Sequence, residues 1–400
     1  MSDAMPSPFV TLAGAVVDPE VPGIPAHYGA PHREQHELAD GRSVVDLGNR
    51  GVITITGVDR LTWLDSLTSQ RLSTLTPGGS AETLLLSPNG RIEHDIRVFD
   101  DGETTWLLVE GEQTGPLVDF LDRMRFMLRV EVTDRSAEWA TVGALMGAAA
   151  DRSDAPGAEA VQILTRYAAS PAGHPLVWHD AWAQPPVTGW QYAAAVSGHG
   201  DPHPSSSWRY VEVLVPRGEV SALVTALPAA GVTPAGWLAL EALRVEAWRP
   251  RQATEVDDRA IPHEFDWMRT AVHLAKGCYR GQETVAKVHN LGHPPRRLVM
   301  LHLDGSESVL PRHGDPVYAG SGNDRVQVGI ITTPARHGEL GGIALALLKR
   351  SAPVDADLVV VVGGGEAEVA AAQNVIVPPD AGSVAHVPRL PRLGERRAER

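Results

Sequence analysis

The sequence predicts an α+β protein that contains mixed or antiparallel sheets and helices and ends in a small β-barrel. The first observation behind this prediction is a hairpin pattern over residues 82–99, in which two β-rich runs flank the turn sequence PNG. The second is the occurrence of amphipathic helical patterns between such runs, as at 117–128 and 234–250. The third is the change after Gly292, where only short strand patterns separated by Gly, Pro and Asp remain.

The predicted elements follow one another along the chain. Residues 43–57 carry β-branched runs that predict two strands, and Asp59 is a candidate N-cap for a helix with leucines at helical spacing. The hairpin and a strand in TTWLLVE come next and lead to the helix at 117–128. Further β-rich runs end in RYVEVLVP, and the helix at 234–250 opens with Pro and Gly and stops before Pro250.

Composition shifts divide the chain into four predicted parts. An irregular N-terminal segment over 1–40 is rich in Pro, His and acidic residues. A body of two interwoven α+β subdomains spans 41–291, with a linker or loop near 147–160. The barrel spans 292–370. A tail over 371–400 is expected to be disordered because it has no apolar periodicity and ends in a basic run.

Composition and charge also limit the function classes. The 400 residues carry a formal net charge of −14, which argues against sequence-independent nucleic-acid binding and against attachment to anionic membranes. There is no apolar run of about 18 residues, no signal-peptide pattern at the start, and one cysteine, which cannot form an internal disulfide. We therefore expect a soluble, cytoplasmic protein with neither nucleic acid nor membrane as a partner, and the metal-binding and phosphate-binding motifs HExxH, CxxC and P-loop are absent from the sequence.

The return strand of the hairpin places one carboxylate in a position that a ligand site can use. With a period of two, one face of the strand carries mostly apolar residues and the other carries charged ones, namely Arg91, Glu93, Asp95 and Arg97. Asp95 can therefore project into a cavity. The competing interpretation is a surface charge on a half-exposed strand, and the residues alone favour that interpretation.

The stretch KGCYRGQE, residues 276–283, contains the one cysteine of the chain, Cys278. Lys276 and Arg280 each lie two residues from it, so in an extended loop both cations can stabilise a thiolate, which is the nucleophilic and metal-binding form. The alternative is a small buried side chain, because free cysteine is among the most buried residue types. Cys–His chemistry needs a histidine base at the sulfur, and the sequence does not identify one among 16 histidines. The residues leave the reaction open.

These residues also carry a family resemblance. KGCYRGQETVAKVHNLG resembles the K-G-C-Y-x-G-Q-E signature of YgfZ-type folate-binding proteins, which are relatives of the glycine-cleavage T-protein, an aminomethyltransferase. The stretch from 43 to 79, the segment NGRIEHDIRVF and the helix sequence LRVE resemble other parts of that family, as does the barrel-like end. The resemblance implies a T-protein-like fold of several domains with a C-terminal β-barrel.

What the resemblance implies about function is an accessory protein that binds tetrahydrofolate, or a substituted folate, and supports iron–sulfur cluster assembly or repair in client enzymes. Iron–sulfur clients or assembly factors would then be its partners. Cys278 would be the functional thiol, with Lys276 and Arg280 supporting the thiolate. The implied folate-contacting residues are Asp95, Arg244, Tyr279, Gln282 and Glu283, of which the last two can instead fix the loop by hydrogen bonds.

Two alternatives remain open at this stage. The first is a folate-dependent aminomethyltransferase or other one-carbon transferase, in which Asp95 orients or deprotonates an amine. The second is a non-catalytic scaffold on the folate-binding fold, with Cys278 as a structural residue. The sequence departs from the T-protein pattern because the Y-T-G-E motif is missing near 209–216 and Glu110 stands where that enzyme has asparagine. Arg244 can also pair with Glu241 on its own helix instead of contacting a ligand.

Overall fold

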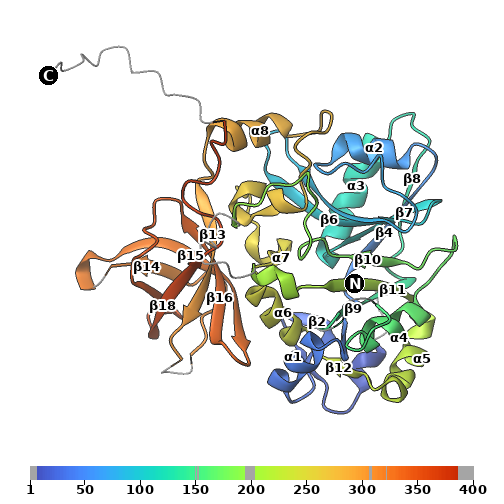
Figure 1. Ribbon diagram of the computed structural model, residues 1–400, viewed down its shortest axis with the longest axis horizontal. Coiled ribbons are helices and arrows are strands. Elements are labelled where there is room, and N and C mark those ends of the chain that lie inside the picture. The colour runs from blue at the N-terminus through green and yellow to red at the C-terminus, as the bar shows by residue number, and fades with distance from the viewer. Residues whose placement is uncertain are drawn as a thin grey trace.

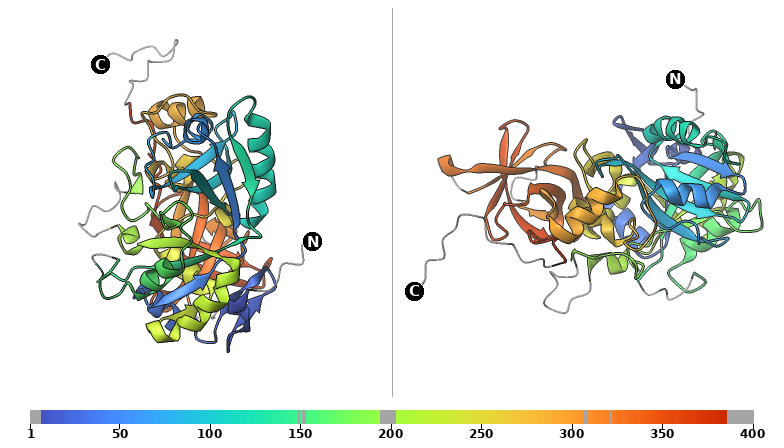
Figure 2. Two further views of the ribbon diagram at one scale, coloured as in Figure 1. Left: turned by 90° about the vertical axis from the view of Figure 1, so that its right-hand side faces the viewer. Right: turned by 90° about the horizontal axis from the view of Figure 1, so that it is seen from above.

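The computed structural model describes residues 7–148, 150, 153–193, 203–305, 309–320 and 322–385. A larger body of sheets and helices lies beside a C-terminal barrel, and helix α6 (Trp237–Glu246) lies where the two meet (Figure 1). Figure 2 shows the same arrangement from above, with the barrel at one end of the long axis. The α+β class and the terminal barrel that the sequence predicts are both confirmed.

The body contains two five-stranded sheets, and the strands of the second sheet all lie in the chain between β3 and β9 of the first. The first has the order β10-β11-β9-β3-β12, and the second has the order β5-β6-β7-β4-β8. The strands of the first sheet are β3 Ser43–Asp46, β9 Trp139–Leu145, β10 Val177–His179, β11 Tyr210–Pro216 and β12 Thr233–Ala235. Those of the second are β4 Gly51–Thr56, β5 Ser80–Leu86, β6 Ile92–Asp100, β7 Thr104–Val109 and β8 Glu131–Asp134. Because consecutive strands β3 and β4 belong to different sheets, the two halves of the body are interwoven.

Helices cover the outer face of each sheet, and α6 packs in the core between them. Helices α2 and α3 pack their leucines on the second sheet, and α4 and α5 do so on the first. The inner faces of both sheets share one apolar cluster with α6, which includes Leu84, Phe99, Leu214 and Leu243. The helices of the body are α2 Arg60–Leu67, α3 Thr114–Met124, α4 Glu159–Tyr167, α5 Val220–Ala226, α6, α7 Gln252–Glu255 and α8 Gln282–Leu291. Polar groups that lie between the sheets are therefore enclosed by protein.

The C-terminal barrel is closed by six antiparallel strands in the order β13-β16-β15-β14-β17-β18. Its strands are β13 Arg296–Leu303, β14 Pro316–Ala319, β15 Val326–His337, β16 Gly341–Lys349, β17 Leu358–Val362 and β18 Ala367–Val375. Its interior is filled by small and branched side chains such as Val299, Ala346 and Val360. Strand β18 pairs with β13 as far as Val375, so the barrel continues past the expected start of the tail at residue 371. Residues 386–400 of that tail lie outside the described residues.

The prediction of an irregular segment over 1–40 is wrong for the part that the structure describes. A 3-10 helix (Pro8–Thr11), a hairpin of β1 (Val16–Asp18) and β2 (Val21–His27), and helix α1 (Pro31–Ala39) occur there. Tertiary contacts order this segment, which has no apolar periodicity of its own. Glu34 is 5 % exposed and accepts from the backbone N–H groups of Tyr28, Ala30 and Gly236, the last of which precedes α6. Gln35 reaches the barrel at the carbonyl of Arg336. The segment forms one wall of the groove described below.

Candidate functional site

Strands β5 and β6 are neighbours, and together they turn four side chains toward the interior of the body, namely Glu82, Leu84, Asp95 and Arg97. In the antiparallel pairing Leu84 lies opposite Asp95, and Glu82 lies opposite Arg97, so these side chains share the face that packs on the inner core. The period-two alternation predicts this common face for Asp95 and Arg97. Glu82 is 1 % exposed and Asp95 is 3 % exposed, so both carboxyl groups are buried between the sheets.

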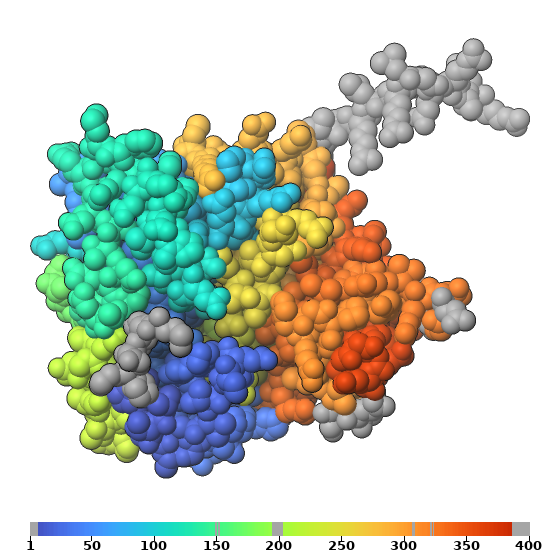
Figure 3. Space-filling model, turned by 180° about the vertical axis from the view of Figure 1, so that it is seen from behind, coloured from blue at the N-terminus to red at the C-terminus, as the bar shows by residue number. Residues whose placement is uncertain are grey.

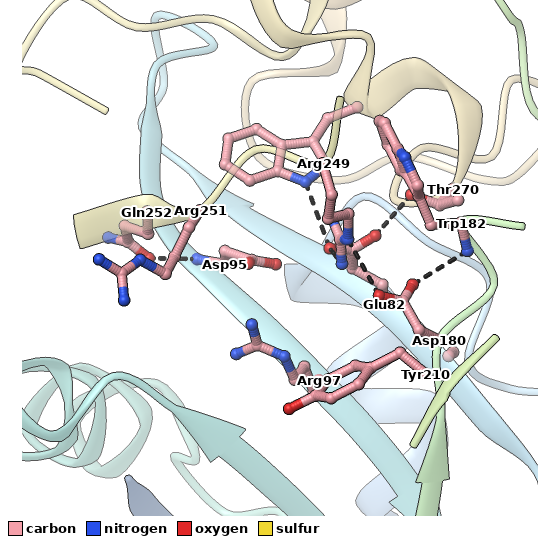
Figure 4. Close-up of polar contacts among 12 residues, drawn as sticks. Glu82, Asp95, Arg97, Asp180, Trp182, Tyr210, Arg249, Arg251, Gln252 and Thr270 are labelled. Atoms are coloured by element: carbon pink, nitrogen blue, oxygen red, sulfur yellow. Dashed lines mark hydrogen bonds and ion pairs between the residues drawn. The ribbon is translucent and has the colours of Figure 1, made fainter. Parts of the chain in front are cut away.

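Three buried carboxyl groups and one guanidinium form what we call the charge centre, which consists of Glu82, Asp95, Asp180 and Arg249 (Figure 4). Nη2 of Arg249 lies 2.5 Å from Oε1 of Glu82, and its Nε lies 3.0 Å from Oδ2 of Asp180. Arg249 also lies over the Trp182 ring, 5.0 Å from its centroid. Burial raises the cost of every unpaired charge, so the distribution of partners decides which group is ionised.

The two carboxyl groups from β5 and β6 differ in their partners. Glu82 accepts from Arg249, from Nε1 of Trp267 at 3.2 Å, and from the hydroxyl of Thr270. Burial alone would raise the pKa of Glu82, but the attraction of Arg249 and Arg97 and the hydrogen bonds from Thr270 and Arg249 together outweigh it, and the pKa is lowered. Burial raises the pKa of Asp95, and the negative charge of Glu82 raises it further. Within the described residues, Oδ1 of Asp95 has no hydrogen-bond partner.

An inner cavity of about 50 Å³ lies beside the charge centre. Its polar walls include Arg50, Arg97, Glu110, Tyr210, Trp237, Glu241, Arg244, Arg249 and Arg251. Burial would raise the pKa of Glu110, but the guanidinium groups of Arg50, Arg251 and Arg97 together lower it to about 2. Glu110 is therefore ionised and has arginines around it.

Two arginines of the inner cavity have unused hydrogen-bonding capacity. Among the residues that the structure describes, the guanidinium groups of Arg97 and Arg251 donate no hydrogen bond. Within the described part of the chain, Arg97 has one ion pair, to Glu212, and Arg251 has one, to Glu241, and both are long at 3.5 Å. Arginines that are largely buried are normally bonded to several acceptors, so these two groups can bind an acceptor-rich ligand at the cost of only their long ion pairs.

A groove of about 1110 Å³ continues from the inner cavity to the surface. The two share Val21, Trp237, Glu241 and Arg251, and Nε1 of Trp237 has no partner among the described residues. The groove lies between the N-terminal segment, α6 and the barrel, where Figure 3 shows a hollow between the blue and orange parts of the chain. Its walls are mostly apolar, and its charged residues are Arg33, Arg251, Arg312 and Arg336 against Glu20 and Glu241. The groove is thus locally basic in an acidic chain.

Arg244, which the resemblance assigns to ligand contact, lines the inner cavity but is occupied by protein acceptors. Its Nε and Nη2 bind the two oxygens of Glu241, and its Nη1 binds Glu255 and the carbonyl of Arg249. The remaining N–H group donates to Thr333 of the barrel. All five N–H groups of the guanidinium are used, so Arg244 joins α6, α7 and β15 and offers no free donor to a ligand.

The cysteine loop lies apart from this cavity. Cys278 is exposed, and it lines neither the inner cavity nor the groove. Nζ of Lys276 donates to the carbonyl oxygens of Asp65, Thr68 and Gln70 at the end of α2, and Arg280 pairs with Glu93. Both cations that the sequence assigns to the thiolate are therefore engaged with other partners, and they hold the loop in place.

Three further residues that the resemblance assigns to folate contact, Tyr279, Gln282 and Glu283, lie in or next to the same loop. Tyr279 is buried, and Lys276 lies over its ring at 5.3 Å from the centroid. Gln282 and Glu283 form the first turn of α8, which follows Gly281 in a left-handed conformation (φ 83°). None of these three lines the inner cavity or the groove.

No cluster of His, Cys, Asp and Glu in the described part of the chain is arranged to hold a metal ion. No described helix is long and apolar enough to cross a membrane.

Known proteins resemble this chain in sequence and in fold. The GCVT N-terminal domain family matches residues 19–153. The chain is similar to aminomethyltransferases over most of its length. It is 29 % identical to the aminomethyltransferase of Geobacillus kaustophilus over 325 residues, which cover 79 % of this chain and 82 % of the relative. It is 27 % identical to that of Thermosynechococcus vestitus, with 74 % and 75 % covered.

A solved structure agrees with the sequence comparison. The glycine cleavage system aminomethyltransferase T from Bartonella henselae superposes with a TM-score of 0.66 at 15 % identity, covering 94 % of this chain and 95 % of that one. The fold is therefore that of the glycine-cleavage T-protein, as the resemblance implies. These similarities do not single out the YgfZ type within proteins of this fold, so the YgfZ-type assignment is a proposal.

The alternating pattern predicts the inner face for Asp95, and Asp95 lies there, although it lines neither the inner cavity nor the groove. The other residues of the charge centre have no such signal in the sequence. Glu82, Asp180 and Arg249 come from three separate segments, and in each segment the charged residue reads as an ordinary polar position. The position of Arg97 could be predicted, because the alternation places it on the same face of β6 as Asp95. No sequence pattern shows that Arg97 and Arg251 lack close hydrogen-bond acceptors, because this depends on which acceptors lie nearby in space.

Proposed function

We propose that the protein binds a folate in the inner cavity and groove and transfers a one-carbon unit in the manner of an aminomethyltransferase. The observation that carries this proposal is the continuous cavity and groove, with two guanidinium groups that make long ion pairs inside and a basic, mostly apolar channel outside. The similarity to aminomethyltransferases over about four-fifths of the chain supports it independently. When bound, tetrahydrofolate supplies the acceptor atom for the one-carbon unit.

The chemistry of the cavity suits the three parts of a folate. A pterin edge has both N–H donors and a carbonyl acceptor, and the cavity offers the carboxylate of Glu110 beside the guanidinium groups of Arg97 and Arg251. The apolar walls of the groove suit an aromatic middle section. The surface arginines Arg33 and Arg312 suit the anionic glutamate tail.

Entry of the ring requires side chains to move. A volume of about 50 Å³ corresponds to one or two water molecules. Arg97 and Arg251 are suited to move because they have no protein hydrogen bonds to give up. The cavity therefore widens at little energetic cost when a ligand replaces their long ion pairs.

Titration calorimetry with tetrahydrofolate tests the binding proposal. Arg97→Leu and Arg251→Leu should each weaken binding by roughly tenfold to a hundredfold, the loss expected for one or two hydrogen bonds to a charged donor. Arg259→Leu is the matched control, because Arg259 is exposed and lies outside both the cavity and the groove. An absence of heat with the wild-type protein would refute folate binding.

The transfer reaction needs its own assay. Measurable aminomethyl or methyl transfer to tetrahydrofolate that Asp95→Ala abolishes would support the transferase. Binding without transfer, with any donor amine, would leave a folate-binding protein without this chemistry.

The exposed thiol of Cys278 favours a second candidate function, which is the support of iron–sulfur enzymes. Because the loop is anchored by Lys276 and Arg280 and the sulfur faces solvent, a partner protein or a small thiol can reach it. A single thiolate cannot hold a cluster alone, so the partner must supply further ligands. The test is rescue of iron–sulfur enzyme activity in a deletion strain. Full rescue by Cys278→Ala would show that the thiol is not needed, and failure of the wild-type gene to rescue would remove this candidate.

A further inference from the structure

We propose that Asp95 and Glu82 hold one proton between them, and that Glu82 is the positioning residue that keeps Asp95 in the acid form. The pair lies at the core of the charge centre, and although neither side chain lines the inner cavity, Arg97, Asp180 and Arg249 beside them do. The first support is the count of charges. Three buried carboxyl groups, Glu82, Asp95 and Asp180, are arranged around Arg249. Arg97 lies opposite Glu82 but has its ion pair with Glu212, so among the described residues Arg249 is the guanidinium that pairs directly with these carboxyl groups. Three carboxylates would therefore leave buried negative charge without a direct partner.

The hydrogen-bond donors decide which carboxyl group carries the proton. Asp180 accepts from Arg249, from the backbone N–H of Trp182 and from Nε1 of Trp208. Glu82 also has three donors, one of them Arg249. Three donors favour the ionised form of a carboxyl group, although burial still raises the pKa of Asp180 above its usual value. Asp95 has an Oδ1 with no partner among the described residues, so it is the group for which ionisation is least supported.

The geometry of the hairpin brings the pair together. Asp95 lies diagonally across from Glu82 on the same face of β5 and β6, and its carboxyl group points toward the charge centre (Figure 4). The oxygens of Glu82 have four lone-pair positions and three protein donors, so one position is left for an O–H from Asp95. Burial and the charge of Glu82 both raise the pKa of Asp95, in agreement with this arrangement.

Besides Glu82, the groups that face Asp95 are Arg97, Arg249 and Gln252. Arg97 of its own strand and Arg249 after α6 both favour its ionised form, while Glu82 opposes it. Gln252 of α7 contacts the backbone of Asp95 through Oε1 at 2.6 Å and leaves the carboxyl group free. Burial and Glu82 dominate because both arginines are also drawn to other carboxylates, Arg249 to Glu82 and Asp180, and Arg97 to Glu212.

A protonated Asp95 also determines the pH dependence of one-carbon transfer, a point that rests on the proposed function. Asp95 enters a transfer reaction as an acid, so its proton passes to a basic atom of the ligand and leaves an Asp95 carboxylate beside Arg97 and Arg249. Transfer by the protein should then decline as pH rises through the raised pKa of Asp95. A residue that acted as a base would give the opposite dependence.

The proton itself can be tested without any ligand. At pH 7 the infrared spectrum of the wild-type protein should contain a protonated-carboxylic-acid band that Asp95→Asn removes and Asp119→Asn, at an exposed site on α3, leaves in place. Glu82→Gln should also reduce this band, because the charge that raises the Asp95 pKa is lost. Absence of the band in the wild type would overturn the proposal.

Stability against pH gives a second readout. A carboxyl group whose pKa is raised on folding stabilises the folded state fully below its unfolded pKa, and this contribution is lost as pH rises through the folded pKa. Relative to Asp95→Asn, the folding equilibrium constant of the wild type should therefore fall between about pH 4 and 8, by up to about tenfold per pH unit. Parallel curves for the two proteins would overturn the proposal. Both readouts stay valid if tetrahydrofolate fails to bind, so the two proposals fail separately.

Discussion

Arg244 illustrates how the environment of one residue decides between a ligand contact and a structural contact. Its guanidinium group is 4 % exposed and donates all five of its N–H groups to Glu241, Glu255, Thr333 and the Arg249 carbonyl. The sequence shows only that the arginine lies on an amphipathic helix near Glu241. The structure shows that the same residue also binds the barrel.

We expect Arg244→Met to lower the free energy of unfolding by about 3–5 kcal/mol, because it leaves two buried carboxylates without their partner. Urea denaturation measures the change. Arg259→Met serves as the control, since its ion pair with Asp258 is exposed and should not alter the midpoint. An unchanged midpoint for Arg244→Met would show that these carboxylates are stabilised in another way.

The residue scale also shows where sequence reasoning ends. A period of two places Asp95 and Arg97 on one face of β6, and that placement is correct. The identity of the groups facing them depends on contacts between segments far apart in the chain, which no local pattern records. The same limit applies to the cysteine loop, where local spacing predicts that Lys276 and Arg280 lie near the sulfur, while tertiary contacts direct them to Thr68 and Glu93.

At the scale of elements, the cysteine loop is fixed by the C-terminal end of helix α2. The last carbonyl groups of a helix have no partner within the helix, and Nζ of Lys276 binds those of Asp65 and Thr68 as well as that of Gln70. A cation at this end also interacts favourably with the helix dipole. The loop and the helix thus stabilise each other.

Replacement of Lys276 by methionine should lower the free energy of unfolding by about 2–3 kcal/mol, because buried carbonyl groups lose their donor. Amide hydrogen exchange should rise in α2 and in the cysteine loop, and remain unchanged in the barrel. Lys287→Met on the exposed side of α8 is the matched control. Equal exchange in the two variants would contradict the anchoring role.

The elements differ in how well the sequence predicts them. The hairpin of β5 and β6 and the helix α6 have strong local patterns, so both are predicted near their observed positions. Helix α1 was missed because its stability comes from contacts of Glu34 and Gln35 with α6 and the barrel, and its own sequence lacks an apolar stripe. Segments ordered by distant partners are the ones that periodicity does not reveal.

At the scale of the whole molecule, the groove exists only because three distant parts of the chain meet. The N-terminal segment, α6 and the barrel each supply one wall. Its basic residues lie in a chain of net charge −14, so they concentrate positive potential at one place. An anionic ligand is therefore attracted to this face.

Charge reversal in the groove tests this attraction. Arg33→Glu and Arg312→Glu should each weaken tetrahydrofolate binding by roughly tenfold, and the wild-type affinity should fall as salt concentration rises. Fluorescence titration at several ionic strengths gives both quantities. Arg350→Glu lies outside the groove and should bind as the wild type does. If that control lost affinity equally, the effect would belong to overall charge.

The single exposed sulfur of Cys278 has a practical consequence for the intact molecule. Because the chain has no other thiol, a maleimide dye or spin label attaches at one known position without any engineered substitution. The same uniqueness means that a disulfide between two copies of the chain can form in one way only, as a dimer joined at that residue. Reducing agent or Cys278→Ser would prevent this dimer from forming during purification.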